Sequence, residues 1–186
     1  MRSRILFTLC FISVLVGQVS FSEHTITTST DATDVFAIDI DGDGDIDVLS
    51  ASVDDDKIAW YENNGSESFT THVITTAANG TGSVYAIDVD GDGDIDVLSA
   101  NDFGGEIAWY ENDNSNFTKY IVTSNINNPE SVYAIDLDGD GDIDVLSASE
   151  NDGKIAWYEN NGSESFNLHT IASSATSGIF WGTSVF

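Results

Sequence analysis

"DIDGDGDIDVLSAS", residues 39–52, places an aspartate at every second position of its first nine residues and then continues into an apolar stretch. The segment recurs as "DVDGDGDIDVLSAN" at residues 88–101 and as "DLDGDGDIDVLSAS" at residues 136–149. The copies begin 49 and 48 residues apart. An acidic segment that returns at such a constant period indicates one loop per structural unit, as in repeat proteins.

Each unit also contains four short segments rich in β-branched and aromatic residues. In the second unit these are residues 84–87, 95–100, 107–111 and 117–123, separated by Asp, Gly, Asn and Ser. Segments of this length with such boundaries predict strands. No stretch after residue 22 has the 3.6-residue period of an amphipathic helix, so the predicted fold class is all-β.

The third strand of the unit is apolar on both of its alternating faces. Ile107 and Trp109 share one face, and Ala108 and Tyr110 share the other. A strand buried on both sides fits a small sheet stacked between two neighbouring sheets. Four antiparallel strands in 48 or 49 residues, stacked sheet on sheet, describe β-propeller blades. A β-helix is the alternative, but its repeats are much shorter.

Three full blades are predicted, at about residues 34–82, 83–130 and 131–178, with residues 179–186 as the start of a truncated further blade. His24–Thr27 resembles a fourth strand and predicts an extra N-terminal strand. Because propellers usually have four to eight blades, we expect an incomplete propeller, whose partners include further blades of a longer chain. Pairing of short chains to complete a ring is the alternative.

The beginning of the chain resembles a secretory signal. Two arginines precede the apolar run Ile5–Val16, and small residues follow at Ser20 and Ser22. This pattern predicts a signal peptide over residues 1–22, followed by a propeller segment over residues 23–186. The apolar run is too short for a membrane anchor. We therefore expect a secreted or cell-surface protein with no stable membrane insertion after cleavage.

Charge and cysteine content limit the possible partners and stabilising devices. The formal net charge is −27, which argues against nucleic acid and anionic membrane surfaces as partners. Fifteen of the 32 acidic residues lie in the three repeated loops, and 41% hydrophobic residues argue for a packed core. The one cysteine, Cys10, lies within the predicted signal peptide, so disulfides cannot stabilise the mature chain.

The aspartates have the spacing of a calcium loop. Counted from the first aspartate of each loop, side chains at positions one, three, five and nine and the backbone carbonyl at position seven are the expected ligands, with glycine at position six for the turn. Serine replaces the EF-hand glutamate at position twelve, and strands rather than helices flank the loop. The predicted metal-site residues are Asp39, Asp41, Asp43, Asp45, Asp47, Asp88, Asp90, Asp92, Asp94, Asp96, Asp136, Asp138, Asp140, Asp142 and Asp144.

Electrostatics favours a bound cation over a bare acidic loop. Carboxylates about 4 Å apart repel by roughly 4 kcal/mol per pair at an effective dielectric constant near 20. Oxygen-only ligands select calcium over zinc or copper, and a flexible loop suits calcium better than magnesium. The sequence therefore predicts about three Ca²⁺ ions, which would stabilise the fold in place of disulfides.

The "DxDGDGDxD" loop, the following "VLSAS" and the 48-residue period resemble the FG-GAP/VCBS repeat family, in particular its bacterial-type secreted members. The integrin α-subunit propeller is a more distant relative. The resemblance implies a propeller with calcium loops on one rim, in proteins often involved in adhesion. Val84-Tyr85 replaces the Phe-Gly of the family name, and Ser-Ala-Ser or Ser-Ala-Asn replaces Gly-Ala-Pro. Integrin-specific ligand recognition is therefore not carried over.

The histidines and tryptophans are expected to be structural. His72 and His169 occupy a strand-four position that Tyr120 fills in the second repeat, and His24 occurs in the matching N-terminal segment. Trp60, Trp109 and Trp157 recur in the third strand of each repeat, which favours blade packing over sugar stacking.

The predicted function is a calcium-binding adhesion module for an extracellular protein or glycan. A fragment of a propeller enzyme, such as a polysaccharide lyase or glycosidase, is the rival interpretation, and a purely structural module is the third. No catalytic residue is predicted, because near-identical repeats build a scaffold and active sites need a residue that departs from the pattern.

Overall fold

The computed structural model describes residues 20–28 and 32–173. Its strands form three four-stranded antiparallel sheets, and none of the described residues is helical. The first sheet contains β1 (Ala32–Ile38), β2 (Asp47–Ser52), β3 (Lys57–Asn63) and β4 (Phe69–Thr75). The second contains β5 (Thr81–Ile87), β6 (Asp96–Asn101), β7 (Glu106–Asp113) and β8 (Asn116–Thr123). The third contains β9 (Pro129–Ile135), β10 (Asp144–Ser149), β11 (Lys154–Asn160) and β12 (Phe166–Ser173).

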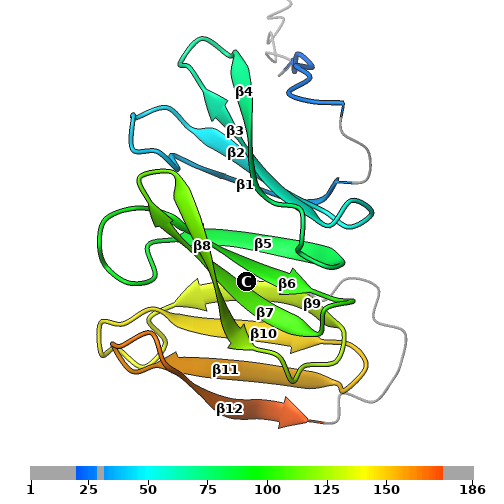
Figure 1. Cartoon of the computed structure of the whole chain (residues 1–186), viewed down its shortest axis with the longest axis vertical. Coiled ribbons are helices and arrows are strands. Elements are labelled where there is room, and N and C mark those ends of the chain that lie inside the picture. Colours follow the sequence, from blue (N-terminus) through cyan, green and yellow to red (C-terminus); the bar gives the residue numbers. More distant parts are fainter. Residues whose placement is uncertain (1–19, 29–31, 174–186) are drawn as a thin grey trace, which may run out of the picture.

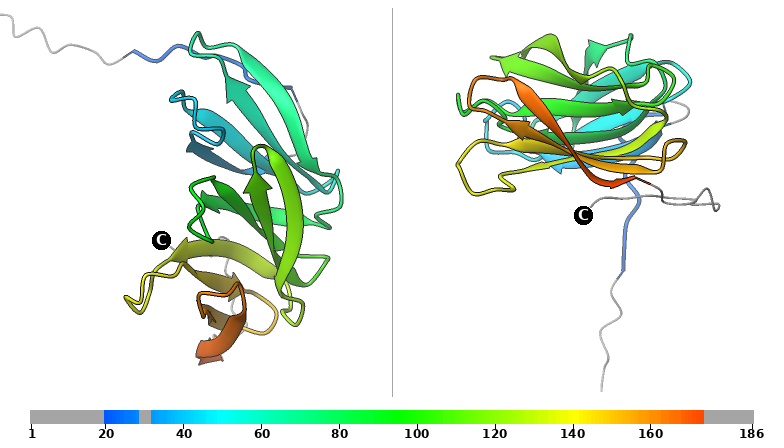
Figure 2. Two further views of the ribbon diagram at one scale, coloured as in Figure 1. Left: turned by 60° about the vertical axis from the view of Figure 1, so that its left-hand side comes forward. Right: turned by 90° about the horizontal axis from the view of Figure 1, so that it is seen from below.

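The strands of each sheet follow one another in chain order, which makes every sheet a meander or blade. The blades stack one on another, and the first strands β1, β5 and β9 lie next to each other (Figure 1). Seen from the side, the stack follows an open curve (Figure 2). The predicted all-β, incomplete propeller is thus confirmed for the part of the chain that the structure describes.

The same cross-strand register recurs in all three blades. Leu49 pairs with Trp60, Leu98 with Trp109 and Leu146 with Trp157, in an ordinary antiparallel pairing of second and third strands. Repetition of the sequence thus becomes repetition of the register, because four residues connect the second and third strands in every blade and the length of the turn fixes the register of a hairpin.

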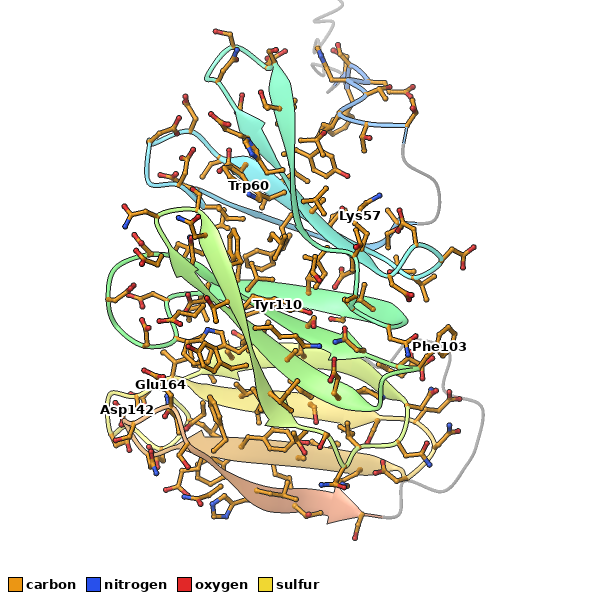
Figure 3. All side chains as sticks on the ribbon, viewed as in Figure 1. Lys57, Trp60, Phe103, Tyr110, Asp142 and Glu164 are labelled. Atoms are coloured by element: carbon orange, nitrogen blue, oxygen red, sulfur yellow. The ribbon has the colours of Figure 1, made fainter. Side chains whose placement is uncertain are left out.

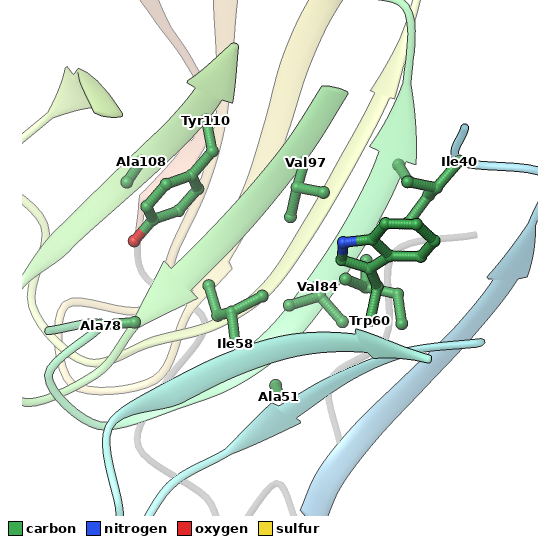
Figure 4. Packing of buried hydrophobic residues seen from close by; sticks show 11 residues of the cluster. Ile40, Ala51, Ile58, Trp60, Ala78, Val84, Val97, Ala108 and Tyr110 are labelled. Atoms are coloured by element: carbon green, nitrogen blue, oxygen red, sulfur yellow. The ribbon is translucent and has the colours of Figure 1, made fainter. Parts of the chain in front are cut away.

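The core lies between the blades. Ala108 and Tyr110 pack toward the first blade, in a cluster that also contains Ile58, Trp60 and Val84 (Figure 4). On the opposite face of the same strand, Ile107 and Trp109 pack toward the third blade, with residues that include Val132, Val145 and Tyr158. The two-sided burial predicted for the third strand of the second repeat is therefore confirmed, and β7 takes part in both junctions.

The predicted extra strand at His24–Thr27 is wrong. Residues 20–28 form no strand. The physical reason is that an outer strand needs the open edge of a third strand, and β4, β8 and β12 already occupy these edges in the three blades. Most of the predicted signal peptide and all of residues 179–186 lie outside the described residues. Within the described ranges, no helix has the length and hydrophobicity needed to cross a bilayer.

Candidate metal centres

The three acidic loops connect the first and second strands of their blades and lie at the same rim of the stack (Figure 1). Figure 3 places Asp142 and Glu164 at this rim, whereas Lys57 and Phe103 lie at the opposite rim. In each blade the first and second strands are antiparallel neighbours, so the short loop that connects them lies at one end of the blade. Because the same arrangement recurs in every blade, the three loops lie at the same end of the stack. The predicted aspartates are thus brought together within each loop, and the three loops are repeated along one edge of the molecule.

The first aspartate of each loop organises the turn through both carboxylate oxygens. Asp88 Oδ1 accepts a hydrogen bond from the backbone N–H of Gly91 at 2.7 Å, and Oδ2 accepts one from Gly93 at 3.1 Å. Asp39 and Asp136 accept the equivalent pairs of bonds in their own loops. The two glycines have φ of +80° and +102°, a conformation that favours glycine, which explains why glycine recurs at positions four and six.

The aspartates at positions three and five continue the same pattern. Asp90 Oδ1 accepts a bond from the N–H of Asp92 at 3.1 Å, and Asp92 Oδ1 accepts one from the N–H of Asp94 at 2.8 Å. These bonds recur in the first and third loops. Each of these bonds uses only one oxygen of the carboxylate. The turn therefore orients the whole carboxylate, and the lone pairs of the second oxygen can bind a cation.

The aspartate at position nine is buried, unlike the other aspartates of the loop. Asp47, Asp96 and Asp144 are between 0% and 1% exposed. Asp96 Oδ2 accepts a bond from the N–H of Val89 at 3.0 Å, and Oδ1 accepts one from the N–H of Asn112 at 2.8 Å. Equivalent pairs of bonds hold Asp47 and Asp144. Position nine therefore ties the loop to the end of the third strand.

An asparagine that sequence reasoning missed completes this clamp. Asn112 is 2% exposed, and its Nδ2 donates to the carbonyl oxygen of Ile95, the position-eight residue, at 3.0 Å. Asn63 and Asn160 donate to Ile46 and Ile143 in the same way. The signal was present in the sequence, since this asparagine ends the "AWYEN" segment in all three repeats.

Three clusters of carboxylates have ligand oxygens within 4.8 Å of one another, one cluster in each blade. Positions one and three belong to all three clusters. The third member is at position five in the first loop and at position nine in the other two. The clusters consist of Asp39, Asp41 and Asp43, of Asp88, Asp90 and Asp96, and of Asp136, Asp138 and Asp144.

The remaining predicted site residues lie outside these clusters. Asp47, Asp92 and Asp140 occupy positions nine or five of their loops, with the hydrogen bonds given above. The position-seven side chains turn toward the connection between the third and fourth strands. Asp94 Oδ2 accepts a bond from the N–H of Asn114 at 3.0 Å. Asp142 lies so close to Gly162 that a Cβ there would be 2.6 Å from its Oδ2, and Asp45 lies equally close to Gly65. This orientation agrees with a ligand role for the backbone carbonyl, not the side chain, at position seven.

The electrostatics of the loops reflects crowding of like charges. Loss of hydration within the loop raises the pKa of the position-three carboxyls of Asp41, Asp90 and Asp138, and the position-five carboxylate next to each of them raises this pKa further. Burial raises the pKa of Asp96 to about 7, although the N–H groups of Asn112 and Val89 act in the opposite direction. A cation placed among these oxygens would favour their charged forms and lower these pKa values.

The donor set fits calcium. Each cluster offers carboxylate oxygens only, on a loop whose backbone is held by its own aspartates. Hard oxygen ligands in a flexible loop are what calcium prefers, and thiolate or imidazole ligands of softer metals do not occur in any cluster. The geometry can therefore hold one divalent cation per blade at the rim.

In each blade, the tryptophan of the third strand stacks on an aromatic ring of the fourth strand. His72 stacks on Trp60 with ring centroids 4.4 Å apart, and His169 stacks on Trp157 at 4.5 Å. Tyr120 takes the histidine position against Trp109 at 5.0 Å. The structural role predicted for these residues is confirmed in the three blades. His24, in contrast, lies outside any strand, with its Nδ1 3.5 Å from Glu67 Oε2.

Comparison with protein-family models explains this repetition. The model of the FG-GAP-like repeat matches three overlapping stretches, residues 39–99, 88–147 and 136–186, each of which begins at the first aspartate of a loop. The chain belongs to the FG-GAP-like repeat family. The first two FG-GAP-like matches run from one acidic loop to the second strand of the next blade, and the third runs to the end of the chain. The resemblance predicted from the loop sequence is confirmed.

Among solved structures, the FG-GAP-like chain is similar to a lectin of Agrocybe aegerita, described by its recognition of non-reducing terminal N-acetylglucosamine. The TM-score is 0.55 at 17% sequence identity, over 78% of this chain and 40% of the lectin chain. At this identity the likeness concerns the fold alone, and the chain spans less than half the length of that lectin. No curated protein matches the chain in sequence.

Proposed function

We propose that this chain is a secreted or cell-surface binding module whose propeller blades are each stabilised by one calcium ion. The observation that carries the proposal is the recurrence, once per blade and at the same rim, of an acidic cluster whose ligand oxygens lie within 4.8 Å of one another. A structural device that is repeated once per blade serves the scaffold of every blade. A catalytic group would instead be expected to depart from the repeat.

Calcium would be held by the aspartates at positions one, three, five and nine, with the carbonyl at position seven. When bound, the ion supplies charge compensation and cross-links the loop between the first and second strands. The protein's own contribution is preorganisation, because backbone N–H groups orient the carboxylates before binding, as Gly91 and Gly93 do for Asp88. Extracellular modules of this kind bind calcium with dissociation constants of about 0.1–1 mM, which suits a protein outside the cell.

The binding role is supported by family and fold. FG-GAP-like repeats build the chain, and a lectin that recognises terminal N-acetylglucosamine has a similar fold. We assign an extracellular protein or glycan as the partner, and no catalytic activity. The net charge of −27 argues against nucleic acid and anionic lipid, since both are bound by basic surfaces.

The calcium proposal is tested by calorimetric titration of the purified, metal-free chain. In one variant, position one is neutralised in every loop (Asp39→Asn, Asp88→Asn and Asp136→Asn). In the matched control, the same change is made at position seven, where the side chain turns away (Asp45→Asn, Asp94→Asn and Asp142→Asn). We expect the first variant to lose calcium binding and the control to retain it. Equal binding by the two variants would contradict the assigned ligands.

The partner and the location are tested separately. A glycan array that includes terminal N-acetylglucosamine, together with extracellular matrix proteins, is probed in calcium and in chelator. We expect calcium-dependent binding to a member of one of these classes, and absence of binding to all of them would overturn the adhesion role. Mass spectrometry of the protein from a secreting host should give an N-terminus at Glu23. An intact Met1 on protein that stays in the cell would contradict secretion.

A further inference from the structure

The two blade junctions in the described residues use the same pair of faces. The leading face of a blade, which packs on the following blade, contains Ile58 and Trp60 in the first blade and Ile107 and Trp109 in the second. The trailing face, which packs on the preceding blade, contains Val84 and the alanine and tyrosine of the third strand, as Figure 4 shows for the first junction. Each junction is thus heterologous, with one leading and one trailing face.

The leading face of the third blade is exposed. Ile155 is 40% exposed, whereas its equivalents Ile58 and Ile107 are 0% exposed. Leu137 is 45% exposed, whereas Ile40 and Val89, at the same loop position, are only 2% and 3% exposed. Ile171, on the last strand, is also exposed, at 57%. The third blade therefore presents, uncovered, the same kind of apolar residues that form the interior of the other two junctions.

The trailing face of the first blade is exposed along its first two strands. Val35 is 65% exposed, whereas its equivalents Val84 and Val132 are both 4% exposed. Ile46, at position eight of the acidic loop, is 56% exposed. Ala59 and Tyr61 are already buried, so the uncovered part of this face lies on β1 and at the start of β2. The described chain thus carries both halves of a third junction, at opposite ends of the stack.

A row of aromatic side chains on the first strands of the three blades runs along the stack, from the first blade to the third. Phe36 packs on Tyr85 with ring centroids 4.9 Å apart, and Tyr85 packs on Tyr133 at 4.7 Å. The row crosses both junctions and ends at the exposed leading side of the third blade. A further trailing face placed there would bring another aromatic residue of the Phe36 type next to Tyr133.

We infer that the occupant of the exposed leading face is a second copy of this chain, docked through the trailing face of its first blade. Two copies that dock on each other make two identical heterologous junctions and a closed ring of six blades, because the described residues of each copy form three. Heterologous junctions of this kind close into rings when the rotation permits. Three copies would make nine blades, outside the usual range of four to eight for propellers.

The test is the molar mass of the purified full chain in solution, measured by sedimentation velocity over about two decades of concentration. We expect a dimer of twice the 20.0 kDa chain mass, or of twice the mature mass after cleavage of the leader. Ile155→Asp and Val35→Asp, each at an exposed position, should each give a folded monomer by circular dichroism. The control is Ile121→Asp, because Ile121 is 48% exposed although its blade has a neighbour on each side.

Mixing the two monomeric variants distinguishes the proposed geometry from other dimers. The Ile155→Asp chain keeps an intact trailing face, and the Val35→Asp chain keeps an intact leading face. An equimolar mixture can therefore form one unaltered junction, and we expect a heterodimer with weaker affinity than the unaltered ring. A symmetric dimer through one shared patch would not be restored by mixing. A monomeric unaltered chain, or a dimer that neither variant weakens, would overturn the inference.

Discussion

Asn112 offers a sharp test of how the loops are clamped, because its amide holds the position-eight carbonyl without carrying any charge. The perturbation is Asn112→Ala, which removes the Nδ2 bonds to Ile95 O at 3.0 Å and to Ile40 O at 3.5 Å, and the Oδ1 bond from the Ser115 N–H at 2.8 Å. Ser115 is exposed and its N–H can bond to water. The cost therefore comes mainly from the carbonyls of Ile95 and Ile40, which lose their bonds to an amide that is 2% exposed. An unmet buried polar group costs about 1–3 kcal/mol.

The matched control is Asn116→Ala in the neighbouring turn. Asn116 Nδ2 also donates to backbone carbonyls, those of Asp113 at 2.9 Å and Asn114 at 3.2 Å, but its side chain is exposed. Water replaces these bonds, so we expect the free energy of unfolding to change by no more than about 0.5 kcal/mol. The assay is urea unfolding in excess chelator. Equal losses for the two variants would refute the idea that the buried asparagine clamps the loop.

Three further predictions concern the core and the titrating groups. Ile107→Ala should lower the free energy of unfolding by about 2–5 kcal/mol, whereas Ile121→Ala should cost much less, because Ile107 is 0% and Ile121 48% exposed. Similar losses in urea unfolding would contradict the burial of the junction. The pKa of Tyr85 is raised to about 12 from 10.0 by burial and by a hydrogen bond with Tyr133, so its contribution to stability is present below pH 10 and lost toward pH 12. Tyr85→Phe, which copies Phe36 of the first blade, should flatten this alkaline limb of the stability curve, and an unchanged limb would assign it to another group. In chelator, the buried Asp96 carboxyl holds its proton more tightly than in the unfolded chain. Its contribution to the free energy of unfolding is therefore complete below the ordinary aspartate pKa of 3.8 and is lost as pH rises through its folded pKa of about 7. Asp96→Asn or saturating calcium should each remove this limb from the pH dependence of unfolding, and its persistence in both would contradict the assignment.

Much of this molecule can be predicted from sequence because its information is local and repeated. The alternation at Ile107–Tyr110 predicted two buried faces, and both are found. The two-residue spacing of the aspartates predicted a compact acidic loop between two strands, and the structure adds that the side chains hold this loop through bonds to N–H groups only two to five positions away. Turns of this kind depend little on the rest of the fold.

The features that could not be predicted depend on tertiary packing. His24–Thr27 has the composition of a strand but finds no open strand edge. Ile155 has the same local sequence as Ile58, yet its exposure is 40% instead of 0%, because only a neighbouring blade can cover it. The role of Asn112 depends on β7 ending beside the acidic loop, a proximity that neither segment encodes by itself.

In the proposed function, the three acidic loops act as calcium clamps. The most direct measurement is thermal unfolding of the chain in about 5 mM calcium and in excess chelator, with the Asp39→Asn, Asp88→Asn and Asp136→Asn variant as control. At ten times the dissociation constant each site adds about 1.4 kcal/mol, so three sites add about 4 kcal/mol. For a chain of this size we predict a calcium-dependent rise in Tm of roughly 10 °C, absent from the variant. The same Tm in calcium and chelator for the folded, unaltered chain would contradict the central claim.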